Sequence, residues 1–358
     1  MWIAILIALI AVLAVVLIKI LAGHRRSSAF SAPSASVSNP LATLNIESNV
    51  PFSTPDIDTV FDECYRLALG VPQLHRSSLG DHAPVLDAVS KALDESVHER
   101  DYFPRRPMLL PKLLQTLNDS DTSREELVRV LLEDPTLAGA VLQRANSAYY
   151  RVSPEPIESL DRAVFLLGTD GLRSLMAAAI LQPVFRMPRG AFQNFPDFTW
   201  EQAERTAIAA EVNAKTIGDA EPIVAQLLGS LSLLANIVLF RLTMDKYRDF
   251  PQLTPRADVL TEAIRTQRSC VASLIAQAWK MSDLSIAAFT EQQQRMPPAH
   301  MSSLGRAVYF GDLAGALAML TSRGYRTQKQ AQETLASQGG DLEIARAMWL
   351  AAASAAQN

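Results

Sequence analysis

The chain has 358 residues, of which 49% are hydrophobic and 20% are charged, and its formal net charge is -4 at pH 7. This composition can supply a sizeable apolar core, and the weak negative charge argues against a nucleic-acid-binding protein, which would carry a basic stripe. The two cysteines, Cys64 and Cys270, lie far apart without CxxC spacing, so they cannot by themselves form a disulfide framework or a zinc site.

The first 22 residues predict a single transmembrane helix. Residues 1–21 are apolar except for Lys19, and a helix needs about 20 apolar residues to cross the hydrocarbon core. A cleaved signal peptide is the alternative. Its basic residues would precede a shorter apolar run, whereas Lys19, Arg25 and Arg26 lie at and after the end of this one. By the positive-inside rule, we expect the N-terminus outside the membrane and the main domain in the cytoplasm.

Residues 23–55 are rich in Ser, Pro and Ala and predict a flexible linker without a packed core. Residues 56–106 then predict a helical lead-in, with one helix that stops at Gly70 and a second from about Pro84 to Val97. We expect the lead-in to pack on the domain that follows, because one face of its second helix carries apolar side chains that need cover: Leu86, Val89 and Leu93.

Residues 107–295 are helical almost throughout by pattern. Ser123 and Glu126 predict a capping box, Asp134 and Pro135 predict a helix start, and Gly168 predicts a helix end. Further helices are expected at about residues 199–217, 222–242, 256–280 and 282–294. Residues 296–358 predict a helical extension broken near Gly324 and Gly339. The fold class is therefore all-α, a compact multi-helix bundle.

The stretch 224–240 is apolar enough to raise the alternative of a second membrane span. It is shorter than a full crossing and contains four polar residues, which favours a buried central helix of a soluble bundle. Those residues are Gln226, Ser230, Ser232 and Asn236.

An ordered series of short motifs runs through the helical block. Its strongest marks are Asp134-Pro135, Asn146-Ser147 and Gly168, followed much later by Trp279. Over about residues 107–295 this series resembles the HDOD family, bacterial signalling domains derived from the HD phosphohydrolase superfamily. The residues themselves are explained by folding, since Asn146 and Ser147 fall where a helix ends and can bond freed backbone groups.

The resemblance implies an HD-like bundle, and in the HD superfamily such a bundle holds metal ions through an adjacent His–Asp pair and further His and Asp ligands. Alignment by eye places Ser232 and Leu233 at the pair and Gln202 at an earlier ligand position. No histidine lies between His98 and His300. Ser, Leu and Gln cannot replace that ligand set, so the sequence predicts no metal, no cofactor and no catalytic residue, and hence no enzyme.

The preferred functional hypothesis is a non-catalytic signalling or scaffold module at the cytoplasmic face of the bacterial inner membrane, with a protein partner docked between helices. A cleft that binds a small ligand without turning it over stays open. One alternative is a cryptic metal-dependent phosphohydrolase that uses carboxylates alone. Another is a structural component of a membrane complex, held by small residues of the span: Ala4, Ala8, Ala11 and Ala14.

Overall fold

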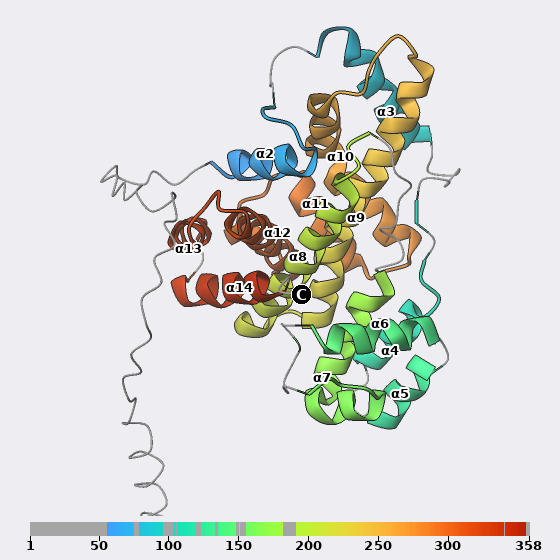
Figure 1. The fold of residues 1–358 in the computed structure, drawn as a ribbon, viewed down its shortest axis with the longest axis vertical. Coiled ribbons are helices and arrows are strands. Elements are labelled where there is room, and N and C mark those ends of the chain that lie inside the picture. Colours follow the sequence, from blue (N-terminus) through green and yellow to red (C-terminus); the bar gives the residue numbers. More distant parts are fainter. Residues whose placement is uncertain are drawn as a thin grey trace, which may run out of the picture. The chain divides into compact units, whose positions relative to one another are not determined.

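A computed structural model describes residues 56–74, 79–95, 103–104, 106–118, 123–132, 135–147, 150, 155–181, 191–339 and 341–355. The predicted transmembrane helix and linker lie outside these residues. Within the described part of the chain every regular element is an α-helix or a short 3-10 helix, so the all-α prediction is confirmed (Figure 1). All of these helices belong to one unit of mutual contacts, Phe52–Asn358.

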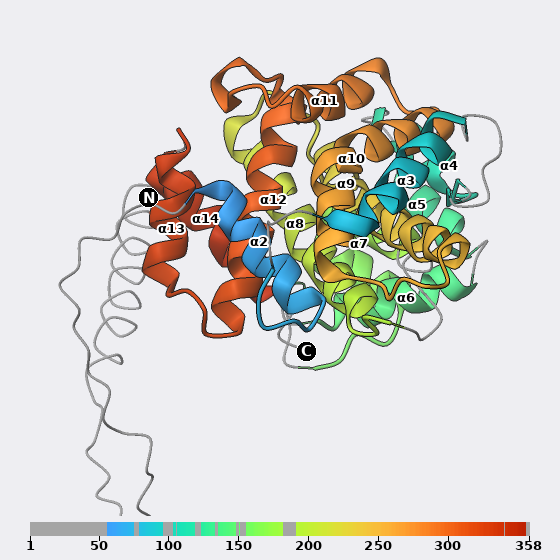
Figure 2. The same cartoon turned by 90° about the horizontal axis from the view of Figure 1, so that it is seen from above.

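The lead-in folds onto the main body, as expected. It contains α2 (Ile57–Ala68), a 3-10 turn (Gly80–His82) and α3 (Ala83–Glu95). Helix α2 packs mainly against α12 (Ser303–Ser322), while α3 packs against α9 (Pro222–Lys246) and α10 (Ala257–Ala278), as the view from above shows (Figure 2). Val89 and Leu93 are buried by this packing, which supplies the cover that their helix face requires.

Four helices form the group drawn in teal and green in Figure 1. They are α4 (Leu110–Asn118), α5 (Arg124–Leu132), α6 (Pro135–Ala145) and α7 (Leu160–Leu181). The capping box before α5 is confirmed: the Glu126 backbone N–H donates to Ser123 Oγ at 3.2 Å, and the Ser123 N–H donates to Glu126 Oε2 at 3.4 Å. Gly168 interrupts α7 with a φ of 71°, a conformation that favours glycine, so the predicted helix break is real although helix resumes immediately.

The remaining helices form the main body. After α8 (Phe195–Ile217) come α9, a 3-10 turn (Tyr247–Asp249), α10, α11 (Asp283–Gln293), a second 3-10 turn (Pro298–His300), α12, α13 (Gln328–Ser337) and α14 (Leu342–Ser354). Helix α8 begins four residues earlier than predicted, because Pro196 in its first turn is compatible with a helix start. The break between α12 and α13 contains Gly324, as expected.

Helix α9 is the central helix of this body. It packs against α8, α10, α12, α7 and α3. Together with the following turn it is long and apolar enough to cross a membrane, and so is α7, but 94% of the apolar stretch in α9 is buried inside the protein. Burial among other helices is what the sequence predicts for a core helix.

Small residues bring α8, α9 and α12 unusually close together. An added Cβ at Gly315 of α12 would lie 2.9 Å from the backbone N of Thr206 in α8. At Gly311 it would lie 3.0 Å from the Thr206 carbonyl oxygen, and at Gly229 of α9 it would lie 3.2 Å from that same oxygen. These three glycines therefore set the spacing of α8, α9 and α12, and two of these helices carry Ser232 and Asp312, which are described below.

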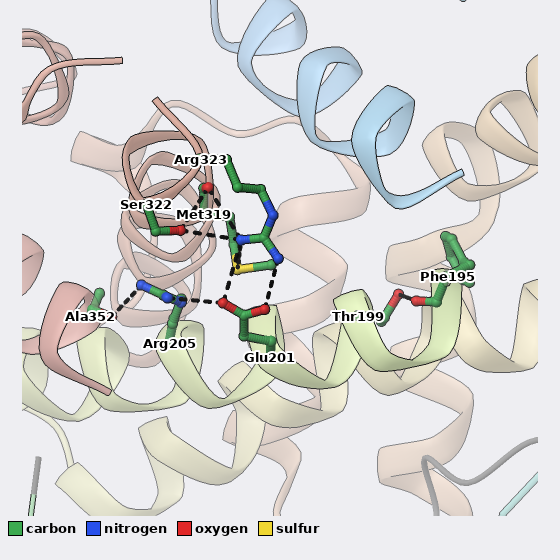
Figure 3. Close-up of polar contacts among 8 residues, drawn as sticks. All are labelled: Phe195, Thr199, Glu201, Arg205, Met319, Ser322, Arg323 and Ala352. Carbon is green, nitrogen blue, oxygen red and sulfur yellow. Dashed lines mark hydrogen bonds and ion pairs between the residues drawn. The ribbon is translucent and has the colours of Figure 1, made fainter. Parts of the chain in front are cut away.

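An ion cluster around Glu201 joins α8 to α12 and α14 (Figure 3). Arg205 donates to Glu201 Oε1 at 2.9 Å and to the Ala352 carbonyl oxygen at 3.2 Å. Arg323 donates to Glu201 Oε2 at 2.8 Å, and its guanidinium lies 4.6 Å from the centre of the Phe198 ring. The predicted C-terminal extension is thus fastened to the core by charged side chains as well as by apolar packing.

Candidate functional site

A cavity of about 470 Å³ borders the position where the sequence alignment places the HD pair. We call it the Ser232 cavity. Its polar wall includes Tyr65 of α2, Ser232 of α9, Arg268 of α10, Gln292 of α11, and Tyr309 and Asp312 of α12. Phe61, Phe289 and Leu313 contribute apolar wall.

Ser232, Arg268 and Asp312 form one hydrogen-bonded cluster. The Ser232 hydroxyl lies 2.8 Å from both carboxylate oxygens of Asp312, so it can donate to either. The Arg268 guanidinium donates through Nη2 to Ser232 Oγ and to Asp312 Oδ2, and through Nε to the Ser232 carbonyl oxygen at 3.1 Å. The hydroxyl, the carboxylate and most of the guanidinium donors are therefore hydrogen-bonded within the cluster.

The cluster lies deep in the protein, and this burial shifts the pKa values of its groups. Only 13% of the Arg268 side chain and 12% of the Asp312 side chain are exposed. Burial alone would lower the pKa of Arg268, but the neighbouring Asp312 carboxylate and the Tyr65 hydroxyl raise it above its ordinary value. Burial also raises the pKa of Tyr65 and of Asp312, although the charge of Arg268 and the hydrogen bond from Ser232 act against burial at Asp312. Arg268 is consequently a permanent cation bonded to Asp312, and Tyr65 is a neutral acceptor for it.

These residues do not fit a metal ion. Catalytic metal sites need several convergent His, Asp or Glu ligands and an open coordination position. Across the residues that the structure describes, His, Cys, Asp and Glu do not gather in any group of three that could hold a metal. Asp312 is the acidic group next to Ser232, and the Arg268 guanidinium occupies the space against its carboxylate that a metal cation would need.

The other two aligned positions are structural. Leu233 is fully buried in the apolar core beside Ser232. Gln202 is buried in α8 and lines neither this cavity nor the second one described below. The structure therefore brings Ser232 into a polar cluster but leaves Leu233 and Gln202 apart from it.

Arg268 and Asp312 were not among the candidate residues from the sequence. Asp312 interrupts the otherwise apolar run from Phe310 to Leu320, and a charged residue in a buried helix is seldom present without a partner. That pattern was the available signal for Asp312. Nothing in the local sequence marks Arg268 as its partner, because the two residues are 44 positions apart and meet only when α10 and α12 pack together.

The motif residues have distinct positions. Asn146 ties the end of α6 to a later segment: its amide nitrogen donates to the carbonyl oxygens of Leu142 and Ile157 at 2.9 and 2.8 Å, and its Oδ1 accepts from the Ile157 N–H at 2.7 Å. The Trp279 indole is buried and donates to the Pro104 carbonyl oxygen at 2.9 Å. Asp134 lies outside the described residues, and α6 begins at Pro135, where the motif places a helix start.

Ser147 differs from its neighbour Asn146, because it lines a second cavity of about 410 Å³. We call this the Gln226 cavity. Its wall also includes Tyr150, Trp200, Glu204, Gln226 and Ser230. The motif segment that the sequence explains by folding alone thus also contributes to a cavity wall.

Comparison with known proteins agrees with this fold. The family model for the HDOD domain matches residues 103–295, more than half of the chain. No curated protein matches the chain.

Solved structures show the same architecture at low identity. A protein from Shewanella amazonensis SB2B, whose name assigns it to the metal-dependent phosphohydrolases, is 14% identical, with a TM-score of 0.53 over 76% of this chain and 100% of that one. An HDOD domain protein from Geobacter sulfurreducens is 20% identical, with a TM-score of 0.53 over 75% of this chain and 90% of that one. With its helical fold and the ordered motifs from α6 to Trp279, the chain belongs to the HDOD family.

Proposed function

We propose that this protein is a non-catalytic signalling or scaffold module that acts by binding a protein partner and is tethered to the cytoplasmic face of the bacterial membrane through residues 1–22. One observation carries the non-catalytic part of the proposal: the Arg268 guanidinium is bonded to both Ser232 and Asp312 at the aligned position of the HD pair. A metal bound there would displace the buried Arg268 guanidinium and leave it without the Asp312 carboxylate, at a cost of several kcal/mol.

The absence of catalysis is tested on the purified full-length chain. It is loaded with Mn²⁺, Fe²⁺ or Mg²⁺, and metal content and hydrolysis of p-nitrophenyl phosphate and bis-p-nitrophenyl phosphate are measured together. We expect no stoichiometric transition metal and no turnover above that of buffer with the same metal. One bound metal per chain that is lost in Asp312→Asn would overturn the proposal and favour a phosphohydrolase that uses carboxylates.

The binding role is supported by large apolar side chains that the described surface leaves exposed in the α4–α7 group. Phe165 of α7 is 77% exposed and Leu132 of α5 is 65% exposed. Exposed apolar side chains are common as single residues, but a partner that covers them would gain from burying them. Phe165→Ala and Leu132→Ala should weaken partner capture by the full-length chain in membranes without changing its melting temperature.

The role of the tether is tested by exchanging residues 1–22 for an unrelated single span. If the segment only localises the module, partner capture should be unchanged. Loss of capture in the exchanged protein would instead favour a structural role for lateral contacts between spans.

A further inference from the structure

Helix α2 forms one side of the Ser232 cavity although it lies outside residues 103–295, which the family model matches. Its residues Ile57, Phe61 and Tyr65 line the cavity at intervals of one helical turn, so one face of the helix runs along it. The helix, drawn in blue in Figure 2, lies next to α12. The other walls come from the main body, so without α2 the cavity would be open on this side.

Helix α2 has a small share in the core. It packs mainly on α12 and less on α8 and α10, whereas α9 packs against five helices. A helix of about this length is only marginally stable in isolation, so α2 depends on these contacts. Segments with few buried contacts open locally at a lower free energy than the whole protein unfolds. Four of its twelve residues are buried, and they are Val60, Cys64, Tyr65 and Ala68.

Two ion pairs at the edge of α2 supply further attachment. Arg265 Nη2 of α10 donates to Asp62 Oδ1 at 3.1 Å. Arg326 Nη2, in the segment between α12 and α13, donates to Glu63 Oε1 at 2.8 Å. The four side chains are between 19% and 28% exposed. Water therefore reaches both pairs, and exchanging either pair for bonds to water has a low cost in free energy.

The inner face of α2 meets the Arg268 cluster through Tyr65. This residue is 6% exposed, and its hydroxyl is hydrogen-bonded to the Arg268 guanidinium. The guanidinium also bonds to Ser232 and Asp312, which belong to the main body. Displacement of α2 would therefore uncover the cluster without leaving a buried cation unpaired, and this makes opening of the cavity on this side feasible.

We propose that α2 is a strap that closes the Ser232 cavity and opens separately from the rest of the fold, so that solutes reach the buried cavity wall only when the strap is open. The strap needs neither a partner nor a metal and is independent of the function proposed above. In the sequence the predicted span and linker lead directly into α2. The strap is therefore the first described helix that a change at the tether would reach.

Cys64 is a natural reporter of the strap. It is fully buried on the inner face of α2, and its Sγ donates to the Ala316 carbonyl oxygen of α12 at 3.3 Å. Burial raises the pKa of its thiol, and thiols react as exposed thiolates, so the closed strap protects it from N-ethylmaleimide. Cys270 is only partly buried and is replaced by Ser in every protein tested.

The first test compares Cys64 with a thiol in the core. Labelling of the purified full-length Cys270→Ser chain by N-ethylmaleimide is followed by mass spectrometry. A second protein combines Cys64→Ala and Cys270→Ser with Ala276→Cys, at a fully buried position of α10 that lines neither cavity. We expect Cys64 to react at least about tenfold faster than the thiol at position 276, which only global unfolding exposes. Equal rates would overturn the proposal.

The second test asks whether the strap closes the cavity. Ala272 lies one turn before Ala276 on α10, is 1% exposed and lines the Ser232 cavity. In the same background, we expect the thiol of Ala272→Cys to react at about the rate of Cys64. A much faster reaction would show that the cavity is open with the strap in place. A rate as slow as at position 276 would show that opening of α2 does not uncover the wall, and either result would overturn the proposal.

The third test loosens the strap from outside the cavity. Glu63→Gln removes the ion pair with Arg326 and should speed labelling of Cys64 by about fivefold, as the loss of one partly exposed ion pair implies. The thiol at position 272 should show the same acceleration, and it controls for the direct effect of the Glu63 charge on its neighbour. An equal acceleration at position 276 would mean that Glu63 acts on global unfolding, which would overturn separate opening.

Glu343→Gln is the matched control for this substitution. It removes an ion pair with Arg346 on α14, far along the chain from the strap, and should leave the labelling rates unchanged. Circular dichroism and melting curves check that every variant is folded. None of these rates depends on metal content, phosphatase activity or partner capture, so the strap and the proposed function fail separately.

Discussion

The Ser232 cavity and the Gln226 cavity both border α9, and each is lined by polar residues of this mostly apolar helix. Ser232 and Gln226 are six residues apart, so their side chains point in directions about 120° apart around the helix axis. At Ser232 the polar groups are paired with one another across α9, α10 and α12. At Gln226 one acceptor is left without a partner. The comparison teaches that buried polar residues of one helix can be fully paired at one site and incompletely paired at another.

Removing Arg268 should have the largest effect. Arg268→Met leaves the Asp312 carboxylate buried without its cation, and we expect a loss of about 3–5 kcal/mol in the free energy of unfolding. Urea denaturation followed by circular dichroism measures this loss. Arg248→Met is the matched control, because the Arg248 side chain is 83% exposed and its ion pair with Asp245 should contribute at most about 1 kcal/mol.

The double variant Arg268→Met with Asp312→Leu sharpens the result. It replaces the charge pair with apolar groups, and most of the lost stability should return, since such replacements are often neutral. If Arg268→Met alone is as stable as the natural protein, the cluster is not a buried closure of the site and the contrast with Gln226 disappears.

The next largest effect concerns the close packing of α8, α9 and α12. Gly315→Ala should destabilise the protein by up to about 3 kcal/mol, because the new methyl group meets the Thr206 backbone and must push α12 away from α8. Gly139→Ala makes the same change in α6, where nothing lies within 4 Å, and should stabilise by about 0.5–1 kcal/mol. Changes of the same sign at the two glycines in thermal unfolding would contradict the tight spacing of α8, α9 and α12.

Much of the fold could be predicted from the sequence, because helix boundaries depend on residues that are close together in the chain. Ser123 with Glu126, Pro135 and Gly168 each mark an end that the structure confirms. The burial of α9 followed from its length and its polar interruptions. The start of α8 at Phe195 was missed, although Pro196 lies in its first turn, where proline is compatible with a helix start.

The candidate site could be predicted only in part, because its partners come together through tertiary packing. The sequence identified Ser232 and the lack of histidine ligands. It could not pair Ser232 with Asp312, 80 residues later, or place Arg268 between them. Likewise Asn146 was correctly expected to bond backbone at a helix end, whereas its bonds to Ile157 and the cavity beside Ser147 depend on how α6, α8 and α9 meet.

The neighbours Asn146 and Ser147 allow a direct test of which motif residue the fold requires. Asn146→Ala removes three hydrogen bonds, two of them to Ile157, and should cost about 2 kcal/mol. Ser147→Ala should change stability by no more than about 0.5 kcal/mol, because the side chain lines a cavity. Chemical denaturation measures both. A larger cost at Ser147 than at Asn146 would mean that the motif is structural at the cavity wall as well.

The smallest expected effect concerns two carboxylates one turn apart on the wall of the Gln226 cavity. Burial raises the pKa of Glu204, and the nearby Glu201 raises it further against the attraction of Arg144. Burial acts on Glu201 in the same direction, but the hydrogen bonds and charges of Arg323 and Arg205 together lower its pKa below the ordinary value. The two groups should therefore make opposite contributions to the pH dependence of stability.

Glu201 in its charged form stabilises the fold above its ordinary pKa, and this contribution is lost as the pH falls through its lowered pKa in the folded protein. Charged Glu204 costs stability at neutral pH, and the natural protein recovers that cost as the pH falls from the raised pKa of Glu204 towards its ordinary value. On acidification, the stability of Glu201→Gln relative to the natural chain should therefore rise, and that of Glu204→Gln should fall. Unfolding curves between neutral pH and pH 3 give both slopes. Equal slopes of relative stability against pH would show that Arg144 neutralises Glu204 as completely as Arg205 and Arg323 neutralise Glu201. Gln226 would then be the one described wall residue of this cavity with a buried atom that lacks a hydrogen bond.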